Sequence, residues 1–151
     1  MIKLYKGFIL LALLMLLCSS VYAAPITSPF GWRIHPITGE WKFHSGMDIG
    51  YEEGTAIPAM MPGTVVYSAW YDGYGYTVIL EHENGDHTLY GHCSALYCNY
   101  GQYVDKGTII AAVGSTGFST GPHLHLEYWH DNQYTDPSLS LIHISEPTRR
   151  S

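Results

Sequence analysis

The sequence has few basic residues, and this scarcity narrows the range of possible partners. The 151 residues include 7 Lys and Arg against 13 Asp and Glu, which gives a formal net charge of −6. Between residues 24 and 138 the basic side chains are Arg33, Lys42 and Lys106. Proteins that hold nucleic acid or anionic lipid do so through clustered Lys and Arg. We therefore expect no nucleic acid and no charged membrane surface as a partner.

The sequence also lacks an apolar run of the ~20 residues that span a bilayer. The run at 8–17 follows two lysines and precedes small residues, a pattern typical of a secretory signal peptide. We expect residues 1–23 to be this signal, cleaved after Ala23, which predicts a secreted or periplasmic protein of the cell envelope without stable membrane insertion. A lipoprotein signal ending at Cys18 is the alternative, but bulky Leu17 precedes that cysteine where a small residue is typical.

The last residues, 139–151, differ in composition from the Tyr- and Gly-rich sequence before them. They read LSLIHISEPTRRS, which resembles the translation of a sequencing-library adapter. We expect this tail to be non-native and without function, so His143 is not a candidate site residue. An ordinary polar tail is the alternative and has the same consequence.

Cysteine is scarce, with three in the chain. Cys93 and Cys98 follow the expected signal peptide. In an oxidising compartment we expect them to form a disulfide that closes a small loop. Metal ligation together with His92 is the alternative, but a zinc site of this kind would need further soft ligands.

A helical hydrophobic period is absent from the body of the chain. Short runs rich in β-branched and aromatic residues recur instead, separated by turn residues. These runs are 63–70, 76–82, 87–92, 108–114 and 123–129. Asn84-Gly85 between two of them predicts a hairpin turn. We expect an all-β fold, a single compact domain of antiparallel β-sheets over 29–138, preceded by a short linker at 24–28.

The glycine-rich segment AVGSTGFSTGPH, residues 112–123, invites comparison with a phosphate-binding loop. It lacks the Gly-Lys-Ser/Thr ending of such loops, and it leads into a strand rather than a helix. We interpret it as a loop that delivers His123 to a site.

Histidine is abundant, with nine in the chain. In GPHLHLE, a strand would point His123 and His125 to one face, together with Glu127. We expect Glu127 either to orient a histidine as a hydrogen-bond acceptor or to be exposed to solvent.

A second polar pair lies in KFHSGMDIG. In an extended segment His44 and Asp48 share a face, and Gly46 leaves that face open between them. Catalytic zinc sites commonly take three protein ligands from His, Asp and Glu and leave a fourth position for water. His44, Asp48 and one histidine of the His-x-His pair would supply such a set.

Three segments together resemble the lysostaphin-type zinc metalloendopeptidases, which cut peptidoglycan cross-links. These segments are FGWRIHPITGEWKFHSGMDIG, LYGHCS and GSTGFSTGPHLHLE, and the similarity covers about Pro29 to Pro137. The resemblance implies an open groove that holds Zn2+. It implies metal ligation by His44, Asp48 and His125, with His92 and His123 flanking the catalytic water.

Elementary chemistry supports this division of roles. Zinc lowers the pKa of a bound water toward ~7, and a histidine with an unperturbed pKa of ~6.5 can take or return a proton near neutral pH. His92 and His123 can therefore replace the glutamate of the His-Glu-x-x-His peptidases, a motif that this sequence lacks. The sequence does not decide which of the two is the general base.

We expect a zinc-dependent endopeptidase that hydrolyses amide bonds in the peptide cross-links of peptidoglycan. The alternatives are a non-enzymatic cell-wall-binding or activator module that uses the same groove, and a zinc peptidase of other extracellular peptides. The sequence identifies no activating partner. We expect His35 to be structural near the groove, whereas Tyr74 and Tyr76 either line the groove or pack elsewhere.

Overall fold

The computed structural model describes residues 24–139; the expected signal peptide and residues 140–151 of the expected tail lie outside the described residues. The described part is built from β-strands, as expected, and contains no helix long and apolar enough to cross a membrane. The strands in chain order are β1 (Ile26–Ser28), β2 (Gly31–Ile34), β3 (Trp41–His44), β4 (Met47–Ile49), β5 (Ala56–Pro58), β6 (Gly63–Tyr71), β7 (Gly75–Glu81), β8 (His87–Leu96), β9 (Tyr103–Val104), β10 (Ile109–Val113), β11 (Leu124–His130) and β12 (Gln133–Thr135).

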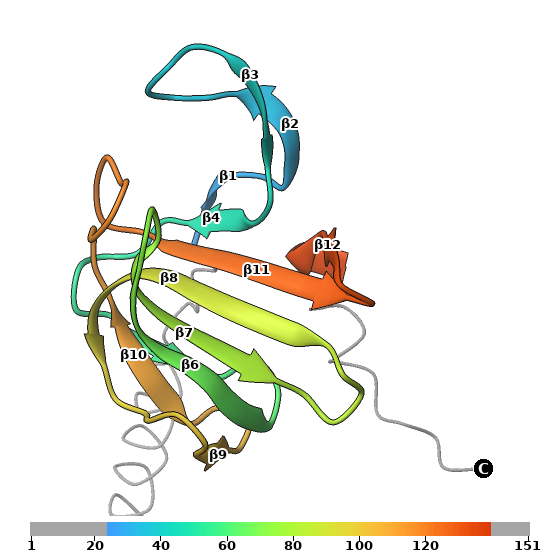
Figure 1. The fold of residues 1–151 in the computed structure, drawn as a ribbon. Coiled ribbons are helices and arrows are strands. Elements are labelled where there is room, and N and C mark those ends of the chain that lie inside the picture. Colours follow the sequence, from blue (N-terminus) through green and yellow to red (C-terminus); the bar gives the residue numbers. More distant parts are fainter. Residues whose placement is uncertain (1–23, 140–151) are drawn as a thin grey trace, which may run out of the picture.

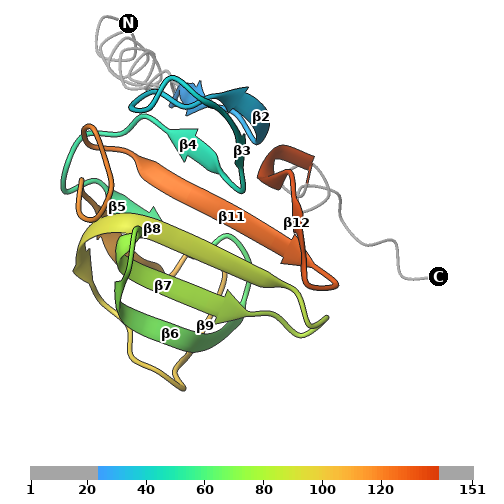
Figure 2. The same cartoon turned by 45° about the horizontal axis from the view of Figure 1, so that its top comes forward.

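The central sheet is antiparallel, in the order β1-β4-β11-β8-β7-β6-β9. Figures 1 and 2 show β11, β8, β7 and β6 side by side. β10 pairs with both β8 and β5, and β12 extends the sheet as a hairpin on β11. The five runs expected as strands become β6, β7, β8, β10 and β11, so the predicted all-β class is confirmed.

The two faces of the central sheet differ because side chains alternate along a strand. Val65, Val78 and Leu80 are fully buried in the core on one face. On β11, Leu124 and Leu126 belong to this core. The alternate residues of β11 therefore point to the opposite face, where the polar side chains gather.

β1 lies within the segment expected as a linker. Its register pairs Ile26 with Ile49 and Ser28 with Asp48 of β4. The sheet therefore begins before Pro29, and β1 braces the strand that carries Asp48.

β2 and β3 form a separate two-stranded ribbon, which projects beyond β4 (Figure 1). Its register pairs Trp32 with Phe43 and Arg33 with Lys42. Because cross-strand partners share a face, the exposed apolar side chains lie on one side of the ribbon. Arg33 lies on the other side, the side that carries His44.

The expected disulfide between Cys93 and Cys98 is not formed in this structure, and both cysteines are free and buried. The Cys93 thiol lies against the carbonyl oxygen of Tyr90, whereas the Cys98 thiol lies against that of Ile110 on a different strand. Among residues 24–139, neither cysteine lies in a group of side chains that could hold a metal ion. Both act as small apolar residues of the core.

Candidate metal centre

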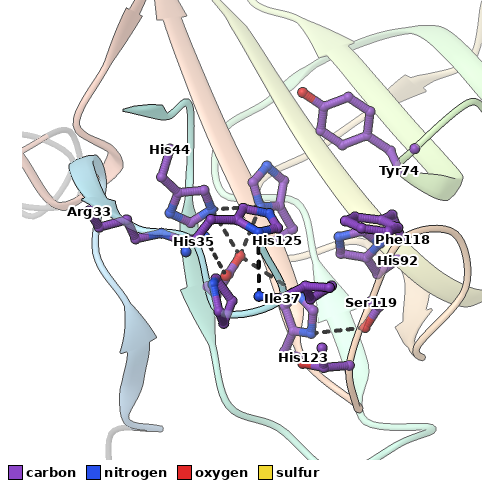
Figure 3. A pocket seen from close by; sticks show the side chains of 14 residues that line it. Arg33, His35, Ile37, His44, Tyr74, His92, Phe118, Ser119, His123 and His125 are labelled. Carbon is purple, nitrogen blue, oxygen red and sulfur yellow. Dashed lines mark hydrogen bonds and ion pairs between the residues drawn. The ribbon is translucent and has the colours of Figure 1, made fainter. Parts of the chain in front are cut away.

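The five histidine and aspartate residues singled out from the sequence line one cavity of about 290 Å³ (Figure 3). They come from β3, β4, β8, β11 and the residue that precedes β11. The residues are His44, Asp48, His92, His123 and His125.

Three of these side chains form a cluster that could hold a metal ion, namely His44, Asp48 and His125. Oδ1 of Asp48 lies 2.8 Å from Nδ1 of His125 and 3.3 Å from Nε2 of His44. The two ring nitrogens are 3.2 Å apart. A tetrahedral zinc ion with ligands at about 2.0–2.1 Å separates neighbouring ligand atoms by about 3.3 Å. The triangle therefore has nearly the size of one face of a zinc tetrahedron.

Hydrogen bonds behind the two histidines fix which nitrogen faces the cluster. Nδ1 of His44 donates to the carbonyl oxygen of Pro29 at 2.8 Å, so Nε2 keeps its lone pair. Nε2 of His125 lies 3.1 Å from Oε1 of Glu127, so Nδ1 is the nitrogen that faces the cluster, where a metal ion would displace its proton. The nitrogens left facing the cluster are the two that form the triangle with Asp48, which is the orientation that metal ligation needs.

Glu127 is fully buried, so the solvent-exposed alternative for this residue is wrong. Oε1 also accepts hydrogen bonds from Ser45 at 2.5 Å and from Tyr74 at 2.8 Å, and Oε2 accepts one from Trp129 at 3.0 Å. Burial would raise the pKa of Glu127, but the interactions with His125, Ser45 and Tyr74 outweigh it and lower this pKa. The carboxylate is thus ionised and orients His125.

Gly46 lets β4 and β11 approach closely. A Cβ at this position would lie 2.5 Å from the backbone oxygen of Leu126 and 2.8 Å from ring atoms of His125. The glycine of the His-x-Gly-x-Asp segment therefore makes room for the third ligand, beyond its expected role of leaving the face open between His44 and Asp48.

The electrostatics of the cluster favour a cation. Burial would raise the pKa of Asp48, but hydrogen bonds with His125 and His44 outweigh it and hold this pKa well below its ordinary value. Burial would lower the pKa of His125, but its bonds with Asp48 and Glu127 raise it to about 9. The two carboxylates thus stabilise positive charge at the centre of the cluster, where a metal ion would supply it.

His92 reaches the cavity through an unusual backbone conformation. Alternation along β8 would send it to the same side as Tyr90, which is buried in the core. Its φ of +59° and the register shift between β7 and β8 interrupt that alternation. Nδ1 donates to the carbonyl oxygen of Thr116 at 2.7 Å, so Nε2 is the nitrogen with a free lone pair. Burial lowers the pKa of His92 to about 4, so the ring is neutral at pH 7.

His123 lies beside His92, with ring centroids 4.8 Å apart. Its Nδ1 donates to the carbonyl oxygen of Gly121 at 2.8 Å, and its Nε2 lies 3.6 Å from Oδ1 of Asp48. The glycine-rich segment forms the loop before His123, as expected. Two histidines that are not in the cluster therefore border it.

Around the cluster, the cavity is lined by the β2–β3, β6–β7 and β10–β11 loops (Figure 3). His35 of the β2–β3 ribbon stacks on Phe118 of the β10–β11 loop at 6.0 Å. Nδ1 of His35 accepts a backbone hydrogen bond from Thr38 at 3.2 Å, which ties the ring to the turn of the ribbon beside the cavity. Tyr74 lines the cavity, whereas Tyr76 packs on Trp70. The sequence patterns did not single out Arg33 or Phe118, which also line the cavity.

Comparison with protein families agrees with this geometry. The model of peptidase family M23 matches residues 42–137, which include all five site residues. The chain belongs to peptidase family M23. The M23 fold is also found in the catalytic domain of lysostaphin from Staphylococcus simulans, which superposes with a TM-score of 0.72 and 30% identity over 79% of this chain and 92% of that one.

Two M23 relatives are named for different activities. The DD-carboxypeptidase/endopeptidase Mpg of Neisseria meningitidis serogroup B is 44% identical over 124 residues, which are 82% of this chain and 29% of Mpg. The murein hydrolase activator EnvC of Escherichia coli K12 is 39% identical over 97 residues, 64% of this chain and 22% of EnvC. The chain thus spans less than a third of either relative.

Proposed function

We propose that this M23 chain is a zinc-dependent endopeptidase that hydrolyses peptide bonds in the cross-links of bacterial peptidoglycan. The observation that carries the proposal is the triangle of His44, Asp48 and His125, whose ligand atoms converge beside two further histidines. The donor set of two imidazoles and one carboxylate is typical of a catalytic zinc site that keeps one position open.

We assign the proton transfers to His92 and His123. A bound zinc ion would polarise the scissile carbonyl and make a water nucleophilic at neutral pH. Nε2 of the neutral His92 is placed to accept the proton of the attacking water and to return it to the leaving amine. Nε2 of His123 faces the same space, and in the imidazolium form it donates a hydrogen bond to an oxygen that gains negative charge.

The relatives support peptidoglycan as the substrate and the cell envelope as the location. Mpg is named a DD-carboxypeptidase/endopeptidase, and lysostaphin an antimicrobial peptidase. EnvC, an activator of murein hydrolases, supports the alternative of a non-enzymatic module. Retention of both proton-transfer histidines and of a complete ligand triangle favours the enzyme.

Mass spectrometry of purified peptidoglycan treated with the zinc-loaded protein tests the proposal. We expect new amine and carboxylate ends at one type of peptide bond. His92→Ala should bind zinc as the wild type does and should release at least 100-fold less product. Zinc binding without any release, restored by adding a second hydrolase, would show an activator. Cleavage of soluble peptides but not of the wall would show a peptidase of other substrates.

A further inference from the structure

We propose that Arg33 binds the free α-carboxylate of the residue that supplies the nitrogen of the scissile bond. The inference rests on the proposed peptidase function and names the substrate feature that the pocket selects. Arg33 of β2 lines the cavity together with the metal-binding cluster and the two proton-transfer histidines.

The ribbon register places this guanidinium beside the metal centre. Gly31 pairs with His44 and Arg33 pairs with Lys42, so Arg33 lies one pleat further along the ribbon face that carries His44. Nη2 of Arg33 lies 3.8 Å from Oδ2 of Asp48, the oxygen that faces away from the two histidine ligands. Figure 3 shows Arg33 entering on the His44 side of the pocket, across from His92 and Phe118.

Arg33 has donors to spare. A guanidinium offers five N–H donors in a planar fork. Nε is buried, and it has no hydrogen-bond partner among residues 24–139. The contact with Asp48 is longer than a hydrogen bond, so it is an ion pair only. The side chain as a whole is 19% exposed in the cavity wall, so its terminal N–H groups are open to an incoming acceptor.

Charge identifies the kind of acceptor. Of the three basic residues between 24 and 138, Arg33 is the one that lines the cavity. The Arg fork matches a carboxylate bidentately, and this recognition is stronger than a neutral hydrogen bond. In a strongly acidic chain, a lone arginine beside the reacting centre is suited to draw an anionic group of the substrate into the pocket.

The two activities for which the relative Mpg is named, DD-carboxypeptidase and endopeptidase, give this carboxylate a place in the substrate. A DD bond joins the carbonyl of one D-configured residue to the nitrogen of a second D-configured centre. The α-carbon of that second centre also carries a carboxyl group. That carboxyl is the free end of the peptide in a carboxypeptidase substrate. It is free again in a cross-link made through a D-configured amine of a diamino acid. In both cases it lies two covalent bonds, about 2.5 Å, from the scissile nitrogen, so one arginine can serve both reactions.

A matched pair of peptides tests the assignment in the full chain loaded with zinc. One stem pentapeptide ends in D-Ala-D-Ala with a free carboxylate, and the other ends in the carboxamide. We expect kcat/KM for the acid to exceed that for the amide by about 10- to 100-fold, as for a hydrogen bond to a charged group. Arg33→Met should bring this ratio close to one, and Arg33→Lys should restore part of it. Lys42→Met removes a charge from the same ribbon outside the cavity and should keep the ratio.

Two further readouts separate this role from its rivals. Calorimetric binding of both peptides does not depend on turnover, so a selective loss of acid binding in Arg33→Met would support the site even if no hydrolysis is seen. Zinc affinity reports on Asp48. If Arg33→Met weakens zinc binding and lowers activity on acid and amide equally, Arg33 merely positions Asp48 and the inference is wrong. A wild-type ratio near one in both rate and binding overturns it as well, while leaving the proposed peptidase intact.

Discussion

Nε2 of His125 donates to Oε1 of Glu127 at 3.1 Å, while Nδ1 of the same ring lies 2.8 Å from Oδ1 of Asp48. The imidazole thus connects a carboxylate of the metal cluster with a buried carboxylate behind it. Such pairs orient the ligand and raise its basicity.

Glu127→Gln should weaken zinc binding by about 10- to 100-fold without unfolding the domain, because an amide cannot accept from all four of the surrounding donors. Competition with a fluorescent zinc chelator measures the affinity, and circular dichroism checks the fold. Glu81→Gln changes an exposed glutamate at the end of β7 and should leave zinc binding unchanged. Equal affinities for wild type and Glu127→Gln would contradict the orienting role.

Gly46→Ala should both destabilise the domain and weaken zinc binding. The added methyl would meet the Leu126 carbonyl oxygen at 2.5 Å and the His125 ring at 2.8 Å, so β4 and β11 must separate. Overpacking of this kind costs about 1–3 kcal/mol, which lowers the melting temperature by roughly 5 °C or more. Gly121→Ala is the control, because a Cβ there meets no atom within 4 Å. A Gly46→Ala protein with wild-type melting and zinc affinity would show that the strands can relax at no cost.

The two cysteines should be unreactive in the native protein. Burial raises the pKa of the Cys93 thiol to about 12 and also raises that of Cys98, so neither supplies thiolate at neutral pH. We expect iodoacetamide to leave both unmodified until a denaturant is added, as peptide mass mapping would reveal. A disulfide-linked peptide in protein that was never reduced would instead restore the bond expected from the sequence.

The sequence predicted those parts of the structure that follow from period and spacing. Alternation predicted the long central strands, and residue type with spacing predicted a ligand set that the fold brings together. Strand alternation could not place His92 at the site, which only the family resemblance implied, because the left-handed φ of +59° reverses the face that alternation assigns. It also could not single out Arg33, whose significance depends on the pairing of β2 with β3. The disulfide predicted between Cys93 and Cys98 is absent from the structure. The prediction rested on an oxidising compartment, whereas both thiols are packed into the hydrophobic core.

His82 should make the stability of the domain depend on pH, independently of the metal centre. Its ring is buried, with Nδ1 donating to the Pro62 carbonyl oxygen at 2.8 Å and Nε2 lying 2.9 Å from Oγ1 of Thr88. Burial lowers the pKa of His82, and the bond with Pro62 offsets this only in part. The unfolded chain, with an ordinary pKa of ~6.5, therefore binds a proton that the folded chain resists.

This difference in proton binding makes the folded domain less stable at acid pH. The contribution of His82 is fully present above pH ~6.5 and is lost as the pH falls from there through the lower pKa of the folded state, by at most about 1.4 kcal/mol per pH unit. Melting temperatures in EDTA at pH 8 and pH 5.5 should therefore differ more for the wild type than for His82→Gln, which has no titrating ring. Other titrating groups contribute equally to both proteins and cancel in this comparison. The same pH-induced drop in both proteins would mean that His82 accepts its proton without leaving its buried position.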